Sequence, residues 1–128
     1  MGTHLIDTNA AIEFLGETLP ASGSQWLEKL VDKNLHRFSI INRIELLGYN
    51  SSPDDMKAMA NFVQASEVLL LTEDVVLKTI ELRKQTKIKL PDAIIAATAL
   101  VHQLTLVSRN TGDFKNISGL KVVNPHLV

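Results

Sequence analysis

The stretch HLIDTNAAIEFL, residues 4–15, joins a short apolar run to a helical pattern through one aspartate. The spacing predicts a buried strand at His4–Asp7 and a helix at Thr8–Gly16. Asp7 stands at the junction, where an aspartate is a common helix N-cap. The carboxyl end of a strand is also where open α/β proteins place functional side chains. The other acidic residues of the chain are needed to distinguish between these two roles of Asp7.

Short apolar runs alternate with helical patterns along the whole chain. Because these runs do not alternate with polar residues, they are typical of strands covered on both faces. The remaining predicted strands are Arg37–Ile41, Val68–Leu71, Leu104–Ser108 and Lys121–Val123. The remaining predicted helices are Ser24–Lys33, Asn42–Tyr49, Pro53–Ala65, Glu73–Thr86 and Pro91–Gln103, with loops at Pro20–Ser24 and Asn50–Ser52. The order predicts an α/β/α sandwich around a mainly parallel sheet of about five short strands.

Composition predicts one globular domain over residues 1–128. The apolar share is 45% and the charged share 21%, and no apolar run approaches the ~20 residues that span a bilayer. The chain has no cysteine, which excludes thiolate metal sites and fits a cytoplasmic protein. We also see no secretory signal. With a net charge of −1, nucleic-acid binding would need a local basic patch.

Four acidic residues follow predicted strands or open a predicted helix. Asp7 ends the first strand, Glu45 lies about one turn beyond the second, Asp92 opens the helix after Pro91, and Asp113 follows the fourth strand. The carboxyl ends of parallel strands share one edge of a sheet, so we expect these carboxylates to converge there.

Each carboxylate also has an ordinary structural interpretation. Asp7 and Asp92 are good helix-start residues, and Asp113 is a common turn residue. Glu45 is harder to explain, because the residues four positions away, Ile41 and Tyr49, predict an apolar helix face. An ion pair with Arg43 or Lys57 is the structural alternative for Glu45.

Clustered carboxylates repel one another, and a divalent cation removes that conflict. Oxygen ligands without His or Cys favour Mg²⁺ or Mn²⁺ over Zn²⁺. The chemistry that such a site supports is metal-assisted attack of water on a phosphodiester.

Four segments together resemble the signatures of the PIN domain, and most closely the VapC-type ribonuclease toxins of type II toxin–antitoxin pairs. They are LIDTNAAI, IELLGY, KLPDAIIAATAL and LVSRNTGDF, which occur in the family's order between residues 4 and 114. The resemblance implies an Mg²⁺- or Mn²⁺-dependent endoribonuclease that leaves 5′-phosphate and 3′-hydroxyl ends. It also implies a homodimer and inhibition by a cognate VapB-type antitoxin.

The resemblance assigns roles to individual residues. Asp7, Glu45 and Asp92 match the metal-site acids, and Asp113 matches the fourth acidic position, which binds directly or through water. Thr8 and Asn110 match supporting polar positions, so the implied catalytic set is Asp7, Thr8, Glu45, Asp92, Asn110 and Asp113. Among the early helices, where the family binds its antitoxin, we select Trp26 as the contact.

Two residues near Glu45 depart from the family pattern. Asn42 stands where members often have serine or threonine, and Arg43 is either an RNA-phosphate contact or an ion-pair partner of Glu45. The candidate RNA-binding cations next to the acidic segments are Arg43, Lys87, Lys89, Arg109 and Lys115; solvated surface charge is the alternative for each.

Other functions remain as competing hypotheses. One is a non-catalytic PIN-like interaction domain, which has no need of clustered negative charge. Another is a metal-dependent DNA nuclease, which the acidic residues alone do not separate from a ribonuclease. A haloacid-dehalogenase-type phosphatase is disfavoured because Asn9 stands where its second aspartate would be, and no phosphate-binding glycine loop occurs.

Overall fold

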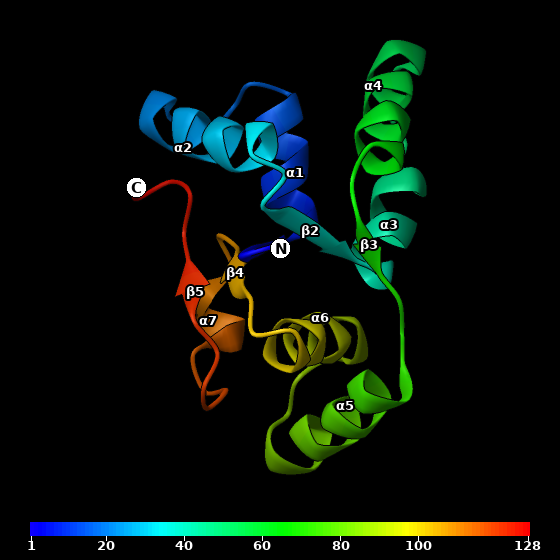
Figure 1. The fold of residues 1–128 in the computed structure, drawn as a ribbon, viewed down its shortest axis with the longest axis vertical. Helices are drawn as coiled ribbons and strands as arrows, with labels where there is room; N and C mark the ends of the chain where they lie inside the picture. The colour runs from blue at the N-terminus through cyan, green and yellow to red at the C-terminus, as the bar shows by residue number, and fades with distance from the viewer.

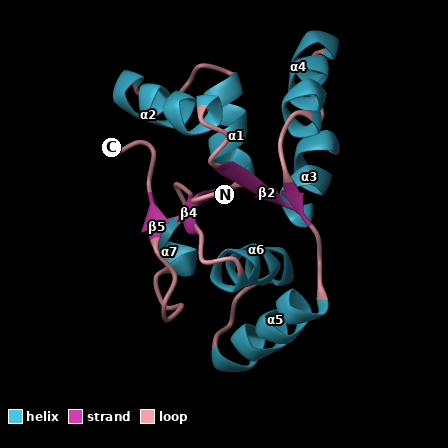
Figure 2. Cartoon of the chain, in the orientation of Figure 1, coloured by secondary structure: helices cyan, strands magenta, loops and turns pink.

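The structure is a computed structural model that describes all residues 1–128 as one sheet surrounded by helices (Figures 1 and 2). The strands are β1 His4–Ile6, β2 His36–Ser39, β3 Val68–Leu69, β4 Thr105–Val107 and β5 Val122–Val123. All are parallel, in the order β3-β2-β1-β4-β5. The predicted α/β class and parallel sheet are confirmed.

Two hydrophobic cores lie on opposite faces of the sheet. Neighbouring residues of one strand point to opposite faces, so Leu5 joins one core and Ile6 the other. Leu106 and Val107 divide in the same way. The first core packs against α5 Glu73–Gln85, α6 Leu90–Val101 and α7 Thr111–Phe114; the second packs against α1 Thr8–Leu15, α2 Ala21–Asp32, α3 Ile40–Leu47 and α4 Pro53–Gln64. The chain is therefore an α/β/α sandwich, as predicted.

Helix starts differ from the prediction by more than one residue in two places. The segment Pro20–Ser24 is not a loop, because α2 begins at Ala21 with Pro20 as its N-cap, and Ser24 lies inside the helix. Helix α3 begins at Ile40, two residues earlier than predicted, because Ser39 forms a capping box with Asn42. The same cap ends β2 at Ser39. The short α7 was not predicted.

The last residues of the chain pack against α2 and α1. Gly23 lies so close to them that a Cβ there would collide with the carbonyl oxygen of Pro125. The Ser22 hydroxyl donates to the carbonyl oxygen of Val128 at 2.6 Å, and His126 pairs with Glu13 at 2.8 Å. This part of the fold depends on close backbone contact rather than on large side chains. None of the helices is both long enough and apolar enough to cross a membrane.

Candidate active site

Asp7 is both a helix cap and a half-buried member of the acidic group. Its carboxylate accepts a hydrogen bond from the Thr8 backbone N–H at 2.9 Å, as the N-cap of α1. Its other oxygen accepts from the Ser108 hydroxyl at 2.8 Å. Burial raises the pKa of Asp7, and the charge of Glu45 raises it further, against the lowering effect of the two hydrogen bonds. The two roles suggested by the sequence are therefore compatible.

Ser108 links Asp7 to the segment that carries Asp113. Its hydroxyl oxygen accepts from the Asn110 backbone N–H at 3.0 Å. The Asn110 side-chain amide then donates to Asp113 at 2.6 Å. Sequence reasoning missed Ser108, although its place at the end of a buried strand, beside the NTGD turn, was a usable signal.

Glu45 is exposed, contrary to the expected apolar helix face. Ile44 and Tyr49 beside it are 61% and 44% exposed, so Glu45 does not occupy a buried stripe. The helix α3 is short and packs mainly through Leu46 and Asn42, which leaves the Glu45 face open. The Thr8 hydroxyl donates to Glu45 Oε1 at 2.6 Å.

Neither cation proposed as an ion-pair partner reaches Glu45. The ion pairs of the structure involve other acids, so pairing with Arg43 or Lys57 does not explain Glu45. Arg43 instead lines a hollow between α3 and α4 together with Leu47 and Val63.

Asp92 shows that the four carboxylates share one electrostatic site. It lies in the first turn of α6. Burial raises its pKa, and the negative charges of Asp7, Asp113 and Glu45 raise it further. Lys89 alone acts in the opposite direction. The predicted convergence of the four acids is thus reflected in their mutual repulsion.

The donor set fits a hard divalent cation, although no three acidic or histidine side chains are arranged as a ready metal site. All the donors are carboxylate oxygens, which suit Mg²⁺ or Mn²⁺. The pKa values of Asp7 and Asp92 are raised first by burial and then by repulsion from neighbouring carboxylates. A cation would relieve that repulsion, so the metal site stays a prediction with a physical basis.

The predicted RNA-binding cations do not all lie at this site. Lys87 and Lys89 line a hollow of about 250 Å³ that also includes Asp92 and Asp113. Arg109 lies 3.6 Å from Glu13 on α1. Lys115 is exposed just after α7, and Arg43 faces α4 instead. Two of the five cations therefore share a hollow with the carboxylates.

Trp26 is half-buried on α2 rather than fully exposed. Its ring packs edge-on against His4, with ring centroids 5.3 Å apart. The neighbouring Leu27 and Leu30 are core residues. A separate hollow of about 150 Å³ lies between α1 and α4, lined by apolar side chains that include Ile12, Leu15 and Met59.

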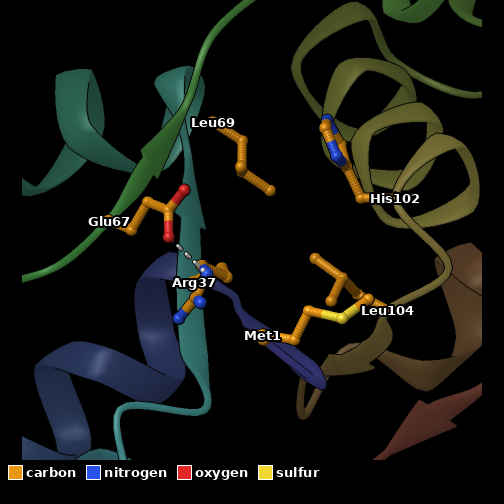
Figure 3. A pocket seen from close by; sticks show the side chains of 7 residues that line it. Met1, Arg37, Glu67, Leu69, His102 and Leu104 are labelled. Carbon is orange, nitrogen blue, oxygen red and sulfur yellow. Dashed lines mark ion pairs between the residues drawn. The ribbon is translucent and has the colours of Figure 1, made fainter.

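The opposite edge of the sheet carries a different kind of polar group. Arg37 on β2 is buried, and its Nε lies 2.9 Å from a Glu67 carboxylate oxygen (Figure 3). Its Nη1 donates to the carbonyl oxygens of Asn34 and His36, both at 2.8 Å. The hollow beside it, about 370 Å³, is also lined by Met1, Leu69, His102 and Leu104 (Figure 3). Sequence analysis had predicted no buried ion pair here.

The chain belongs to the PIN domain family, whose model matches residues 4–120. Its structure is similar to a toxin–antitoxin complex from Klebsiella pneumoniae, with 31% identity, a TM-score of 0.78, and coverage of 96% of this chain and 98% of the other. The family named from the sequence is therefore confirmed. No curated protein matches the sequence significantly.

More distant structures share the fold. VapBC2 from Rickettsia felis, bound to a promoter DNA fragment, is 24% identical with a TM-score of 0.80 and coverage of 95% and 98%. DNA-bound VapBC from Salmonella typhimurium is 22% identical with a TM-score of 0.81 and coverage of 98% and 99%. These two similarities show that the chain has the same fold as those proteins.

Proposed function

We propose that this protein is the toxin of a VapC-type toxin–antitoxin pair and acts as a metal-dependent endoribonuclease. The observation that carries the proposal is the group of four carboxylates in which the pKa values of Asp7 and Asp92 are raised, first by burial and then by the negative charge of their neighbours. Carboxylates held near one another without a cation partner cost stability, and such groups are typical of functional sites. The similarity to a toxin–antitoxin complex supports the biological context.

Each residue of the proposed site has a role of its own. Asp7, Glu45 and Asp92 would hold the cation, and Asp113 would bind it directly or through water. When bound, Mg²⁺ or Mn²⁺ neutralises phosphate charge and makes a nearby water more acidic. Because the Asn110 amide group donates to Asp113, its carbonyl oxygen remains available to orient the attacking water.

The hollow beside the carboxylates is our proposed place for the RNA chain. Lys87 and Lys89 would contact phosphates on either side of the scissile bond, while the carboxylates face that bond. A net charge of −1 for the whole chain means that attraction of RNA depends on such local cations.

An antitoxin of the VapB type is our proposed partner in the cytoplasm. The apolar hollow between α1 and α4, together with Trp26 on α2, is the surface we assign to it. Trp26 is the only tryptophan in the chain, so its fluorescence reports on the α2 part of that surface. We expect the emission to change when the antitoxin is added, and the affinity to fall in Trp26→Ala.

We also propose a homodimer. Large apolar side chains are exposed on α3, after β3 and on α5. They are Ile44, Leu47, Leu70, Leu71, Leu77 and Ile80. A run of exposed apolar residues of this kind is typical of an interface. Sedimentation of the wild type and of Leu77→Glu tests it, since the charge should yield monomers.

RNA cleavage with and without EDTA tests the enzymatic proposal. We expect EDTA to abolish cleavage, excess Mn²⁺ to restore it, and Asp92→Asn to be inactive while remaining folded. Cleavage that survives both EDTA and Asp92→Asn would refute the proposal. Absence of Mn²⁺ binding by calorimetry would favour the non-catalytic domain, and cleavage of DNA but not RNA would favour the DNA nuclease.

A further inference from the structure

We propose that Asn42 is a positioning residue, which directs the Thr8 hydroxyl hydrogen onto Glu45 and so holds that carboxylate ready for the cation. The inference rests on the proposed metal-dependent function. It gives a role to the position at which the sequence departs from the usual serine or threonine. The residues involved, Ser39, Asn42, Thr8 and Glu45, are called the hydrogen-bond row below.

The orientation of the Asn42 side chain is fixed by Ser39. Asn42 Oδ1 accepts the Ser39 backbone N–H at 2.9 Å and the Ser39 hydroxyl at 2.7 Å. Because a carbonyl oxygen has two lone pairs, both are occupied. A flipped amide would turn its N–H groups toward the Ser39 backbone N–H, which can only donate. Ser39 and Asn42 are both 0% exposed, so water does not offer an alternative partner.

The fixed amide determines the direction of the next hydrogen bond. Asn42 Nδ2 donates to Thr8 Oγ1 at 3.1 Å, so the Thr8 oxygen acts as an acceptor there. The hydroxyl has a single hydrogen, which is left free to point at Glu45 Oε1, 2.6 Å away. Donation therefore runs one way along the row, from β2 to the acidic site.

The row matters most for Glu45, because this side chain lies exposed on α3 and has no ion-pair partner. A free glutamate would lose rotamer freedom when it binds a cation. The hydrogen bond from Thr8 restrains one oxygen in advance and leaves Oε2 for the cation. Hydrogen-bond partners that orient metal ligands in this way commonly contribute about 10–100-fold in metal affinity or activity.

Asn42→Asp reverses the row with almost no change in side-chain shape, and it also places a charge at a buried position. The introduced carboxylate keeps one oxygen for Ser39, but it presents its second oxygen to Thr8, whose hydroxyl then donates to it instead of to Glu45. We expect the affinity for Mn²⁺, measured by calorimetry, to fall about tenfold. Added negative charge alone would strengthen cation binding, so a weaker affinity is not a charge effect. Asn61→Asp adds the same charge on the exposed face of α4 and should leave the affinity unchanged.

A double-mutant cycle shows whether Asn42 acts through Thr8. Thr8→Val should lower the Mn²⁺ affinity about as much as Asn42→Asp, Thr8→Ser should restore it, and the double variant should be no weaker than Thr8→Val alone. Additive losses in the double variant would overturn the role of Asn42. So would an unchanged affinity in Asn42→Asp.

Urea unfolding of the metal-free proteins separates this inference from the proposed function. The row predicts that the effects of Asn42→Asp and Thr8→Val on the free energy of unfolding are not additive. A wild type that binds no Mn²⁺ refutes the proposed function, and additive unfolding effects then refute the row as well. A wild type that binds Mn²⁺ but shows additivity in both measurements refutes the row alone.

Discussion

Polar groups of opposite character lie at the two ends of the parallel strands. We call the side of the sheet where the strands begin the amino edge, and the side where they end the carboxyl edge. At the amino edge, the buried Arg37 is balanced by Glu67 and by backbone carbonyl oxygens. At the carboxyl edge, Asp7 and Asp92 face other carboxylates, and their pKa values are raised. The amino edge is thus electrostatically complete, whereas the carboxyl edge is not.

The difference separates structural charge from functional charge. A satisfied buried cation contributes to the fold, and removing it should cost stability. Repelling carboxylates lower stability, so removing one should cost activity but not stability. The two edges should therefore respond to substitution in opposite ways.

The largest expected effect is on catalysis by Asp7→Asn. Asparagine also caps helices, so α1 keeps its start, while the site loses a charged ligand. We expect the rate of RNA cleavage to fall about 100-fold or more, with an unchanged or higher melting temperature. Cleavage assays and thermal unfolding on the same preparation measure both. If the variant is inactive because it has unfolded, the expected difference between the amino and carboxyl edges is contradicted.

The reverse result is expected at the amino edge. Arg37→Met keeps an apolar chain but removes the hydrogen bonds to Glu67, Asn34 and His36. We expect a loss of about 1–3 kcal/mol in the free energy of unfolding, and unchanged cleavage per folded molecule. Since Glu67 is largely exposed, Glu67→Gln should cost less than about 1 kcal/mol. Loss of activity in stably folded Arg37→Met would contradict this division.

The metal-free protein should lose stability as the pH rises through the acidic range. A carboxylate whose folded pKa is raised binds its proton more tightly when folded, so its stabilising effect at low pH is lost between its unfolded and folded pKa values. For Asp7 and Asp92 that window begins near 3.8 and extends upward.

The lowered pKa values of His4 and His36 change stability in the opposite direction, so a difference between variants is the useful measurement. Melting temperatures of the wild type and Asp7→Asn should diverge as the pH rises through the window. Addition of Mn²⁺ should raise the melting temperature of the wild type again. If the two melting temperatures change in parallel with pH, Asp7 is not repelled by its neighbouring carboxylates.

The smallest effects should come from the cations in the hollow beside the carboxylates. Lys87→Gln and Lys89→Gln should each reduce the salt dependence of RNA binding by about one unit of slope. The matched control is Lys57→Gln on α4, which should leave the slope unchanged. Fluorescence anisotropy on the inactive Asp92→Asn background measures this without cleavage. Equal slopes for all variants would place the RNA elsewhere.

The fold was largely predictable because its signals are local. Apolar runs with turn signals identified every strand of the sheet to within about two residues at each end. The errors lie where a side chain decides the boundary. Ser39 ends β2 by capping α3, and Pro20 starts α2 earlier than the serine pattern indicated. The short α7 has too little periodicity to be recognised.

The site was predictable in its charges but not in its hydrogen bonds. The four acids follow strand ends or open a helix, which topology relates to one sheet edge. The roles of Ser108 and Asn42 depend on which atoms donate, and that requires coordinates. The exposure of Glu45 was also hidden, because sequence spacing defines a helix face but not what covers it.

Gly23 has a consequence for genetic experiments. If expression of the toxin stops growth, selection for surviving colonies will collect inactivating mutations. Any side chain at Gly23 collides with the carbonyl oxygen of Pro125, so substitutions there should appear among the survivors although Gly23 has no chemical function. Immunoblotting should show little protein from those colonies and normal amounts from survivors changed at Asp92. The amount of protein in surviving cells would thereby distinguish residues that the chain needs for stable folding from residues that it needs for toxicity.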